Sequence, residues 1–87
     1  MYSREVMVQN QVGLHARPAT FFIQRANTFD SGIWVENDER KVNAKSLLGI
    51  LSLGITRGTQ ITIIANGPDE KEAVDGLVEL VLSNFAE

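Results

Sequence analysis

The chain has 87 residues, a net charge of −3 and an isoelectric point near 5.0, which indicates one domain over residues 1–87 and argues against nucleic acid or an anionic membrane surface as a main partner. It has no cysteine and one histidine, so we expect no disulfide and no metal site, and we assign no cofactor. Because it shows no signal peptide and no run of about 18 apolar residues, we expect a cytoplasmic protein that does not enter the membrane.

The first half of the chain alternates between extended and helical patterns. Residues 5–9 contain Val6-Met7-Val8 and are typical of a strand, and a turn follows at 10–13. Pro18 is tolerated in the first turn of a helix, and apolar residues then recur at helical spacing through 19–29. The β-branched and aromatic run 33–35 predicts a strand, and a turn at 37–39 leads to a short strand at 40–43.

The second half predicts a short helix, a strand and a long helix. An apolar helix is expected over 47–53, the clearest strand of the chain over 60–65, and a final helix over 70–85 with one wide apolar face. Asp69 and Glu72 resemble a capping box at its start. The order β-α-β-β-α-β-α, with a hairpin in the middle, predicts an α+β fold in which three helices cover one face of a four-stranded sheet.

The segment Gly13-Leu14-His15-Ala16-Arg17-Pro18-Ala19 places the one histidine at the expected start of a helix. A neutral imidazole is a good nucleophile towards phosphorus, and a helix N-terminus offers unpaired N–H groups to a phosphoryl group. Arg17 can add a charge-assisted hydrogen bond, and the amides of Ala16 and Arg17 can add more. His15 is therefore a candidate phosphoryl acceptor. The alternative is a surface histidine that caps the helix.

Ser46 stands directly before the short helix. A serine at that position predicts an N-cap. Phosphorylation of Ser46 is a further hypothesis, because a helix N-terminus tolerates the roughly −1.5 to −2 charge of a phosphate, and that charge would change partner binding.

The short helix is apolar nearly all round. Ile50 and Leu53 can face the sheet, which leaves Leu47, Leu48 and Leu51 on a different side. An exposed patch of this kind usually marks a partner surface. The alternative is that a loop covers it.

Residues 13–19 together with Lys45-Ser46-Leu47-Leu48-Gly49-Ile50-Leu51-Ser52-Leu53 closely resemble the HPr family. HPr proteins are histidine-containing phosphocarriers of the bacterial phosphoenolpyruvate-dependent sugar phosphotransferase system, and the resemblance covers the whole chain. It implies a two-layer, open-faced β-sandwich in which three helices cover a four-stranded antiparallel sheet of order 1-4-2-3.

The resemblance also implies roles for individual residues. His15 would accept a phosphoryl group on Nδ1 from enzyme I and pass it to an enzyme IIA domain, while Arg17 stabilises the phosphoryl oxygens. The family's docking surface corresponds to Thr20, Gln24, Leu47, Leu48 and Leu51. Because both partners would use this one surface, we expect a monomer.

Ser46 matches the regulatory serine of HPr from low-GC Gram-positive bacteria. There HPr kinase/phosphorylase modifies the serine, and the product is a corepressor for catabolite control protein A. A second hypothesis is therefore an HPr-like regulatory protein that acts mainly through phospho-Ser46, although such paralogues usually lack the histidine that this chain has at position 15. A third, a small hydrolase that uses His15, lacks a convincing second acid or base.

The chain departs from the family pattern near both motifs. Val12 stands where many members have a polar residue, and Phe21 is larger than the usual residue beside the docking surface. Leu48 and Leu51 replace common methionines, and Glu39 replaces a frequent glycine in the hairpin. None of these changes falls on His15 or Arg17.

Overall fold

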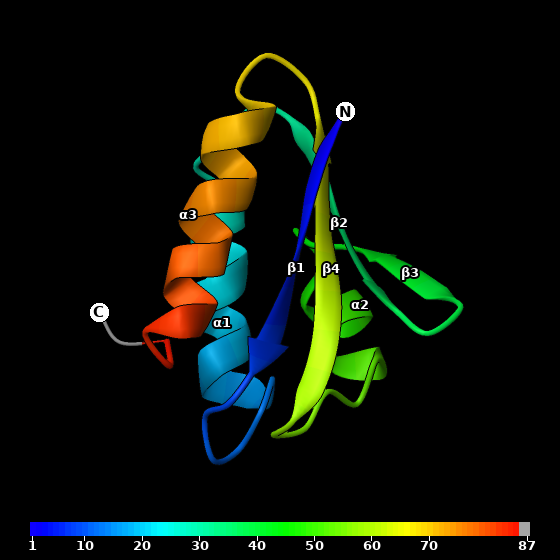
Figure 1. The fold of residues 1–87 in the computed structure, drawn as a ribbon, viewed down its shortest axis with the longest axis vertical. Helices are drawn as coiled ribbons and strands as arrows, with labels where there is room; N and C mark the ends of the chain where they lie inside the picture. Colours follow the sequence, from blue (N-terminus) through cyan, green and yellow to red (C-terminus); the bar gives the residue numbers. More distant parts are fainter. Residues whose placement is uncertain (86–87) are drawn as a thin grey trace.

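The computed structural model describes residues 1–85 and arranges them in two layers, a sheet and three helices (Figure 1). The strands are β1 (Tyr2–Val8), β2 (Gly32–Asn37), β3 (Arg40–Asn43) and β4 (Thr59–Asn66). The helices are α1 (Ala16–Ala26), α2 (Leu47–Ser52) and α3 (Glu70–Leu82). The chain order β-α-β-β-α-β-α is the one the sequence predicts. Within residues 1–85, every helix is too short or too polar to cross a bilayer.

The four strands form one sheet in the order β1-β4-β2-β3, and every neighbouring pair is antiparallel. β4 is the last strand in the chain, yet it lies between β1 and β2 (Figure 1). Its register runs from Val8 opposite Thr59 to Tyr2 opposite Ala65. The strand order that the resemblance implies is confirmed.

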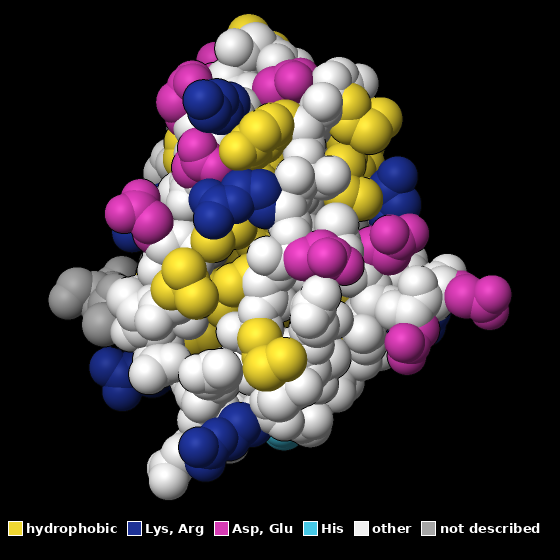
Figure 2. Space-filling view, in the orientation of Figure 1, with side chains coloured by type: hydrophobic (Ala, Val, Ile, Leu, Met, Phe, Trp, Pro, Cys, Tyr) yellow, Lys and Arg dark blue, Asp and Glu magenta, His cyan; other side chains and the backbone are white. Residues whose placement is uncertain are grey.

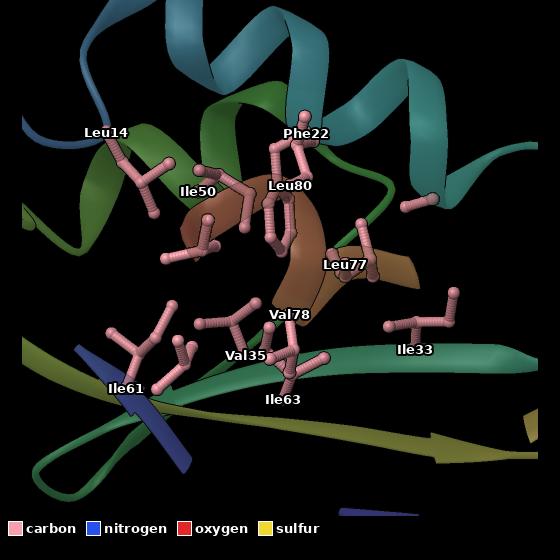
Figure 3. Close-up of a cluster of buried hydrophobic side chains, with 14 of the residues drawn as sticks. Leu14, Phe22, Ile33, Val35, Ile50, Ile61, Ile63, Leu77, Val78 and Leu80 are labelled. Carbon is pink, nitrogen blue, oxygen red and sulfur yellow. The ribbon is translucent and has the colours of Figure 1, made fainter. Parts of the chain in front are cut away.

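The core lies between the sheet and the helices. Alternate strand residues point to the helical side, as expected for a sheet that is covered on one face. These side chains are fully or nearly fully buried, and they are Val6, Val8, Ile33, Val35, Ile61 and Ile63. Figure 3 shows the helical layer closing over them with Phe22 of α1, Ile50 of α2 and Leu77 of α3.

Helix α1 begins three residues earlier than predicted, at Ala16, and ends at Ala26 instead of residue 29. Its first hydrogen bond runs from the N–H of Ala19 to the carbonyl of His15, at 2.8 Å. Pro18 is therefore the third helical residue, still within the turn where an N–H has no partner. At the other end, a turn follows the helix, in which the N–H of Phe29 donates to the carbonyl of Ala26. Phe29 therefore packs against the core without being helical.

Helix α3 ends at Leu82, three residues before the predicted end. Asn84 and Phe85 adopt the left-handed backbone conformation, with φ of 59° and 62°. The N–H of Phe85 donates to the carbonyl of Leu80 at 2.8 Å, and that of Asn84 donates to Val81 at 3.0 Å. This is the Schellman pattern of helix termination. It folds Phe85 back onto the core, where the side chain is only 4% exposed.

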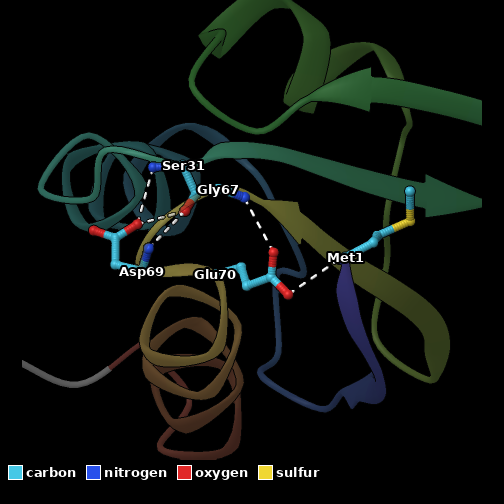
Figure 4. Close-up of polar contacts among 5 residues, drawn as sticks. All are labelled: Met1, Ser31, Gly67, Asp69 and Glu70. Atoms are coloured by element: carbon cyan, nitrogen blue, oxygen red, sulfur yellow. Dashed lines mark hydrogen bonds and ion pairs between the residues drawn. The ribbon is translucent and has the colours of Figure 1, made fainter.

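The predicted capping box at the start of α3 is wrong. Asp69 is the N-cap residue, but its carboxylate makes no capping hydrogen bond. It instead accepts hydrogen bonds from the N–H groups of Asp30 and Ser31, each at 2.9 Å, and from the Ser31 hydroxyl. Figure 4 shows the contacts with Ser31. Glu70, not Glu72, accepts from the N–H of Gly67 at 3.1 Å. Asp69 thus joins the start of α3 to the loop before β2.

We expect Asp69→Asn to reduce stability in a pH-dependent way. Hydrogen bonds from the Ser31 hydroxyl and from the Asp30 N–H lower the pKa of Asp69 below its usual 3.8. A lowered pKa contributes stability that is present above the usual value and is lost as the pH falls through the folded-state value. Urea unfolding followed by circular dichroism should show a lower midpoint for Asp69→Asn at pH 7 and a smaller difference from wild type at pH 3. Glu72→Gln, which alters an exposed carboxylate, is the control and should behave as wild type at both pH values.

A second prediction compares two leucines of α3. Leu77 is fully buried, whereas Leu82 is 65% exposed. Leu77→Ala should lower the free energy of unfolding by about 2–5 kcal/mol, since it leaves a cavity in the core. Leu82→Ala makes the same chemical change on the surface and should stay within about 0.5 kcal/mol of wild type. Equal losses for the two variants would contradict the packing of α3 described above.

Candidate functional site

His15 occupies the N-cap position of α1, with φ of −83° and ψ of −174°. Its carbonyl accepts the first helical hydrogen bond, but its imidazole is exposed and makes no capping hydrogen bond. The next two residues, Ala16 and Arg17, are exposed and belong to the first turn, where N–H groups have no helical acceptor. The structure therefore places an uncommitted imidazole beside two backbone donors.

A close contact between two loops holds this helix start in place. Gly13 has φ of +65°, and a Cβ there would overlap the carbonyl oxygen of Ile55. The N–H of Leu14 donates to that same carbonyl at 3.1 Å, and the Leu14 side chain is 3% exposed. The amide of Asn10 donates to the carbonyl of Gly13 at 2.9 Å. A glycine is required at position 13, and Leu14, the residue directly before His15, is held against the 54–58 loop.

His15 lines an open hollow on the surface. The hollow is bounded by Gln11, Val12, His15, Ala16, Arg17, Pro18 and Thr56. Thr56 is a site residue that sequence reasoning missed, because it lies 41 positions from His15 in a loop without a recognisable motif. The glycine at 13 is the one local signal that another backbone approaches here.

Arg17 lies at the edge of the same hollow. Its guanidinium carbon is 5.6 Å from the centroid of the Phe21 ring, one helical turn further along α1. Within residues 1–85 the guanidinium has no carboxylate or other hydrogen-bond acceptor as a partner. The charge of Arg17 therefore remains available to an anionic group bound near His15.

The charge around the site is opposite to the net charge of the chain. Residues 6–29 and 40–68 contain none of the eleven Asp and Glu residues but six of the eight Lys and Arg. These two segments supply the start of α1, both loops of the site and all of α2. In Figure 2, acidic side chains lie among Lys and Arg over the upper and middle parts of the face, whereas the charged side chains at its lower end are Lys and Arg. The net charge of −3 therefore does not describe the field at His15.

The groups with shifted pKa values lie away from this site. Hydrogen bonds from the N–H of Gly67 and from the N-terminal ammonium lower the pKa of Glu70, and burial together with Asp75 raises the pKa of Tyr2. Tyr2 pairs with Ala65 at one end of β1, whereas the loop to His15 leaves from the other end. Among the described residues, no three His, Cys, Asp or Glu gather where they could hold a metal ion.

Ser46 is the N-cap of α2, as the sequence predicts. Its Oγ accepts a hydrogen bond from the N–H of Gly49 at 3.1 Å, and the residue is half-buried. Two cationic side chains, one near each end of α2, make hydrogen bonds that hold this helix in place. Arg40 donates to the carbonyl and the hydroxyl of Ser52 at the far end of α2, and Lys45 donates to the carbonyl of Phe29 at 2.8 Å.

The predicted apolar patch is exposed on α2. Ile50 and Leu53 face the core, whereas Leu47, Leu48 and Leu51 are 43%, 81% and 37% exposed. The alternative that a loop covers these leucines does not hold for the described residues. α1 packs beside α2, and its Thr20 and Gln24 are exposed as well, with the Thr20 hydroxyl donating to the carbonyl of Ala16.

Comparison with known proteins gives one consistent family. A family model described as the phosphorylation site of the phosphotransferase-system HPr component matches residues 2–83. The HPr-like protein Crh of Bacillus subtilis (strain 168) is 47% identical over 81 residues, which cover 93% of this chain and 95% of Crh. The phosphocarrier protein HPr of Vibrio cholerae is 43% identical over the same share of each chain.

The solved structures that resemble this chain belong to the same family as its sequence relatives. The crystal structure of HPr-C-His from Thermoanaerobacter tengcongensis is 49% identical and superposes with a TM-score of 0.97 over 100% of this chain and 98% of that one. A crystal structure of an HPr dimer from the same organism superposes with a TM-score of 0.80 over the whole of both chains. Both in sequence and in structure, this chain belongs to the HPr family of phosphocarrier proteins.

Proposed function

We propose that this chain carries phosphoryl groups in the sugar phosphotransferase system, from phosphorylated enzyme I to an enzyme IIA domain, with His15 as the acceptor. The observation that carries the proposal is the exposed imidazole at the start of α1, which has no hydrogen-bond partner among residues 1–85 and lies beside Arg17. Membership of the HPr family supports the same role.

The transfer needs one nucleophile and stabilisation of charge. Nδ1 of the neutral imidazole attacks phosphorus, and a new N–P bond forms as the bond from phosphorus to the donor breaks, with its electron pair leaving on the donor. The N–H groups of Ala16 and Arg17 and the Arg17 guanidinium stabilise the phosphoryl oxygens. The reverse sequence of bond changes passes the group to the next acceptor, so the chain is a relay and not an enzyme with a released product.

The partners would dock on the surface that adjoins the site. Leu47, Leu48 and Leu51 provide its apolar part, and Thr20 and Gln24 of α1 provide a polar border. Enzyme I and enzyme IIA would use this one surface in turn, so a carrier that works in the cytoplasm as a monomer suits the relay. The basic segments around His15 favour acidic surfaces on both partners.

A regulatory role through Ser46 is the second candidate function. The 47% identity with Crh favours it, and the two roles are compatible in one protein. HPr kinase/phosphorylase would transfer a phosphoryl group to the Ser46 hydroxyl, and the product would bind catabolite control protein A. The N-terminus of α2 would accommodate that charge without unfolding the helix.

Mass spectrometry of the intact protein tests the relay directly. After incubation with phosphoenolpyruvate and enzyme I, we expect one added phosphoryl group that mild acid removes. His15→Ala should take up none while keeping the wild-type circular dichroism spectrum, because the ring is exposed and makes no capping hydrogen bond. Full phosphorylation of His15→Ala would refute the assignment. A stable phosphate that appears only with ATP and the kinase would favour the regulatory role.

Ser46→Asp should slow phosphoryl acceptance from enzyme I. The variant introduces the first acidic residue into segment 40–68 and so opposes the incoming phosphoryl group and an acidic partner surface. We expect kcat/KM for phosphorylation by enzyme I to fall roughly fivefold at low salt, and by less at high salt where charges are screened. Ser46→Ala removes the cap without adding charge, so its rate should stay close to that of wild type. Equal rates for Ser46→Asp and wild type would exclude this electrostatic effect.

A further inference from the structure

We propose that Phe21 holds the guanidinium of Arg17 in a resting position, from which a phosphoryl group on His15 draws it away. Phe21 is then a positioning residue for the relay. This inference rests on the proposed function, because it concerns the side chain that would stabilise the phosphoryl group.

The resting contact is a cation–π pair within one helix. The 5.6 Å between the guanidinium carbon of Arg17 and the ring centroid of Phe21 falls inside the ~6 Å range of such pairs. The two residues are four positions apart on α1, so their side chains share one face, and the Phe21 side chain leans back towards the turn of Arg17. Phe21 is partly buried and packs against the core, whereas Arg17 is exposed. The ring is therefore the fixed partner and the guanidinium the movable one.

Two adjoining hollows lie on either side of Arg17. Gln11, Val12, Arg17 and Pro18 border both hollows. Phe21 lines only the first, together with Asn10 and the C-terminal turn at Asn84 and Phe85. His15 lines only the second, together with Ala16 and Thr56. Arg17 thus lies where the two hollows meet, and its guanidinium, which rests on Phe21, would turn towards the second hollow to meet a phosphoryl group on His15.

The balance between the two positions follows from the strength of their contacts. Charge-assisted hydrogen bonds from a guanidinium to phosphoryl oxygens are stronger than an exposed cation–π contact, so phosphorylation favours the second position. The contact with Phe21 still opposes the move, because it stabilises only the unphosphorylated carrier. Leucine at position 21 keeps the apolar contact with the core but lacks the π-electrons, so it should remove the opposition without removing Arg17.

The experiment measures the phosphoryl-transfer equilibrium at fixed ratios of phosphoenolpyruvate to pyruvate, with a catalytic amount of enzyme I. We expect Phe21→Leu to raise the ratio of phosphorylated to free carrier about two- to fivefold, the change expected when an exposed cation–π pair is lost. Phe21→Tyr keeps the ring and should match wild type. In an Arg17→Ala background, Phe21→Leu should have no effect, which makes the four variants a double-mutant cycle.

NMR provides a readout that a merely structural role would not change. The δ-methylene protons of Arg17 should show a ring-current shift in the wild type that is lost in Phe21→Leu and also lost when the wild type is phosphorylated. If Phe21→Leu does not fold, Phe21→Met tests the same contact.

Three results would overturn the inference: an unchanged equilibrium in Phe21→Leu, the same change in the Arg17→Ala background, or a ring-current shift that persists in the phosphorylated protein. A wild-type carrier that accepts no phosphoryl group would instead refute the proposed function, and this inference with it. Normal acceptance by the wild type without coupling between positions 17 and 21 refutes the inference alone.

Discussion

The close approach of Gly13 to the carbonyl of Ile55 is the constraint on which the site depends. Only a residue without Cβ fits there, and the carbonyl also accepts the N–H of Leu14. These contacts fix the residue that precedes His15 and so fix where α1 begins. The imidazole itself has no partner within the described residues, and its place is set entirely by the backbone around it. This arrangement suits the proposed role of His15 as a phosphoryl acceptor, since the ring is positioned by the backbone and has no hydrogen-bond partner among the described residues.

The two ends of the molecule use charge in opposite ways. At the junction of β4 and α3, the carboxylate of Asp69 accepts hydrogen bonds from Asp30 and Ser31. The carboxylate of Glu70 accepts a hydrogen bond from Gly67. At the end that carries His15, the loops contain no acidic residue, and the cation of Arg17 rests on an aromatic ring. The acids stabilise the fold where no anion has to bind, and the site is left electropositive. This separation shows how a chain of net charge −3 could attract a phosphoryl group to the proposed site.

Most of the fold could be predicted from local patterns, and the failures have physical reasons. The helical spacing of Phe22 and Ala26 revealed α1, but its start was misplaced because Pro18 suggested a boundary where it is the third helical residue. The end of α3 was misplaced because a Schellman turn leaves Phe85 buried, as a helical continuation also would. The capping box failed because Asp69 found donors in a loop 38 residues away. The last two errors concern a turn that keeps the helical burial pattern and a hydrogen-bond partner that is distant in sequence, whereas the first concerns how far into a helix a proline is tolerated.

The sequence by itself determined the element order, the apolar faces of the helices and the positions of His15 and Ser46 at helix starts, because periodicity and capping are local properties. It also left Leu47, Leu48 and Leu51 without a place in the core. Only the tertiary structure decided that Thr56 lines the hollow beside His15 and that Arg17 lies over Phe21. The first depends on two loops meeting across the fold. The second depends on which rotamer a long, flexible side chain adopts once the core has fixed the neighbouring ring, and no local pattern encodes that choice.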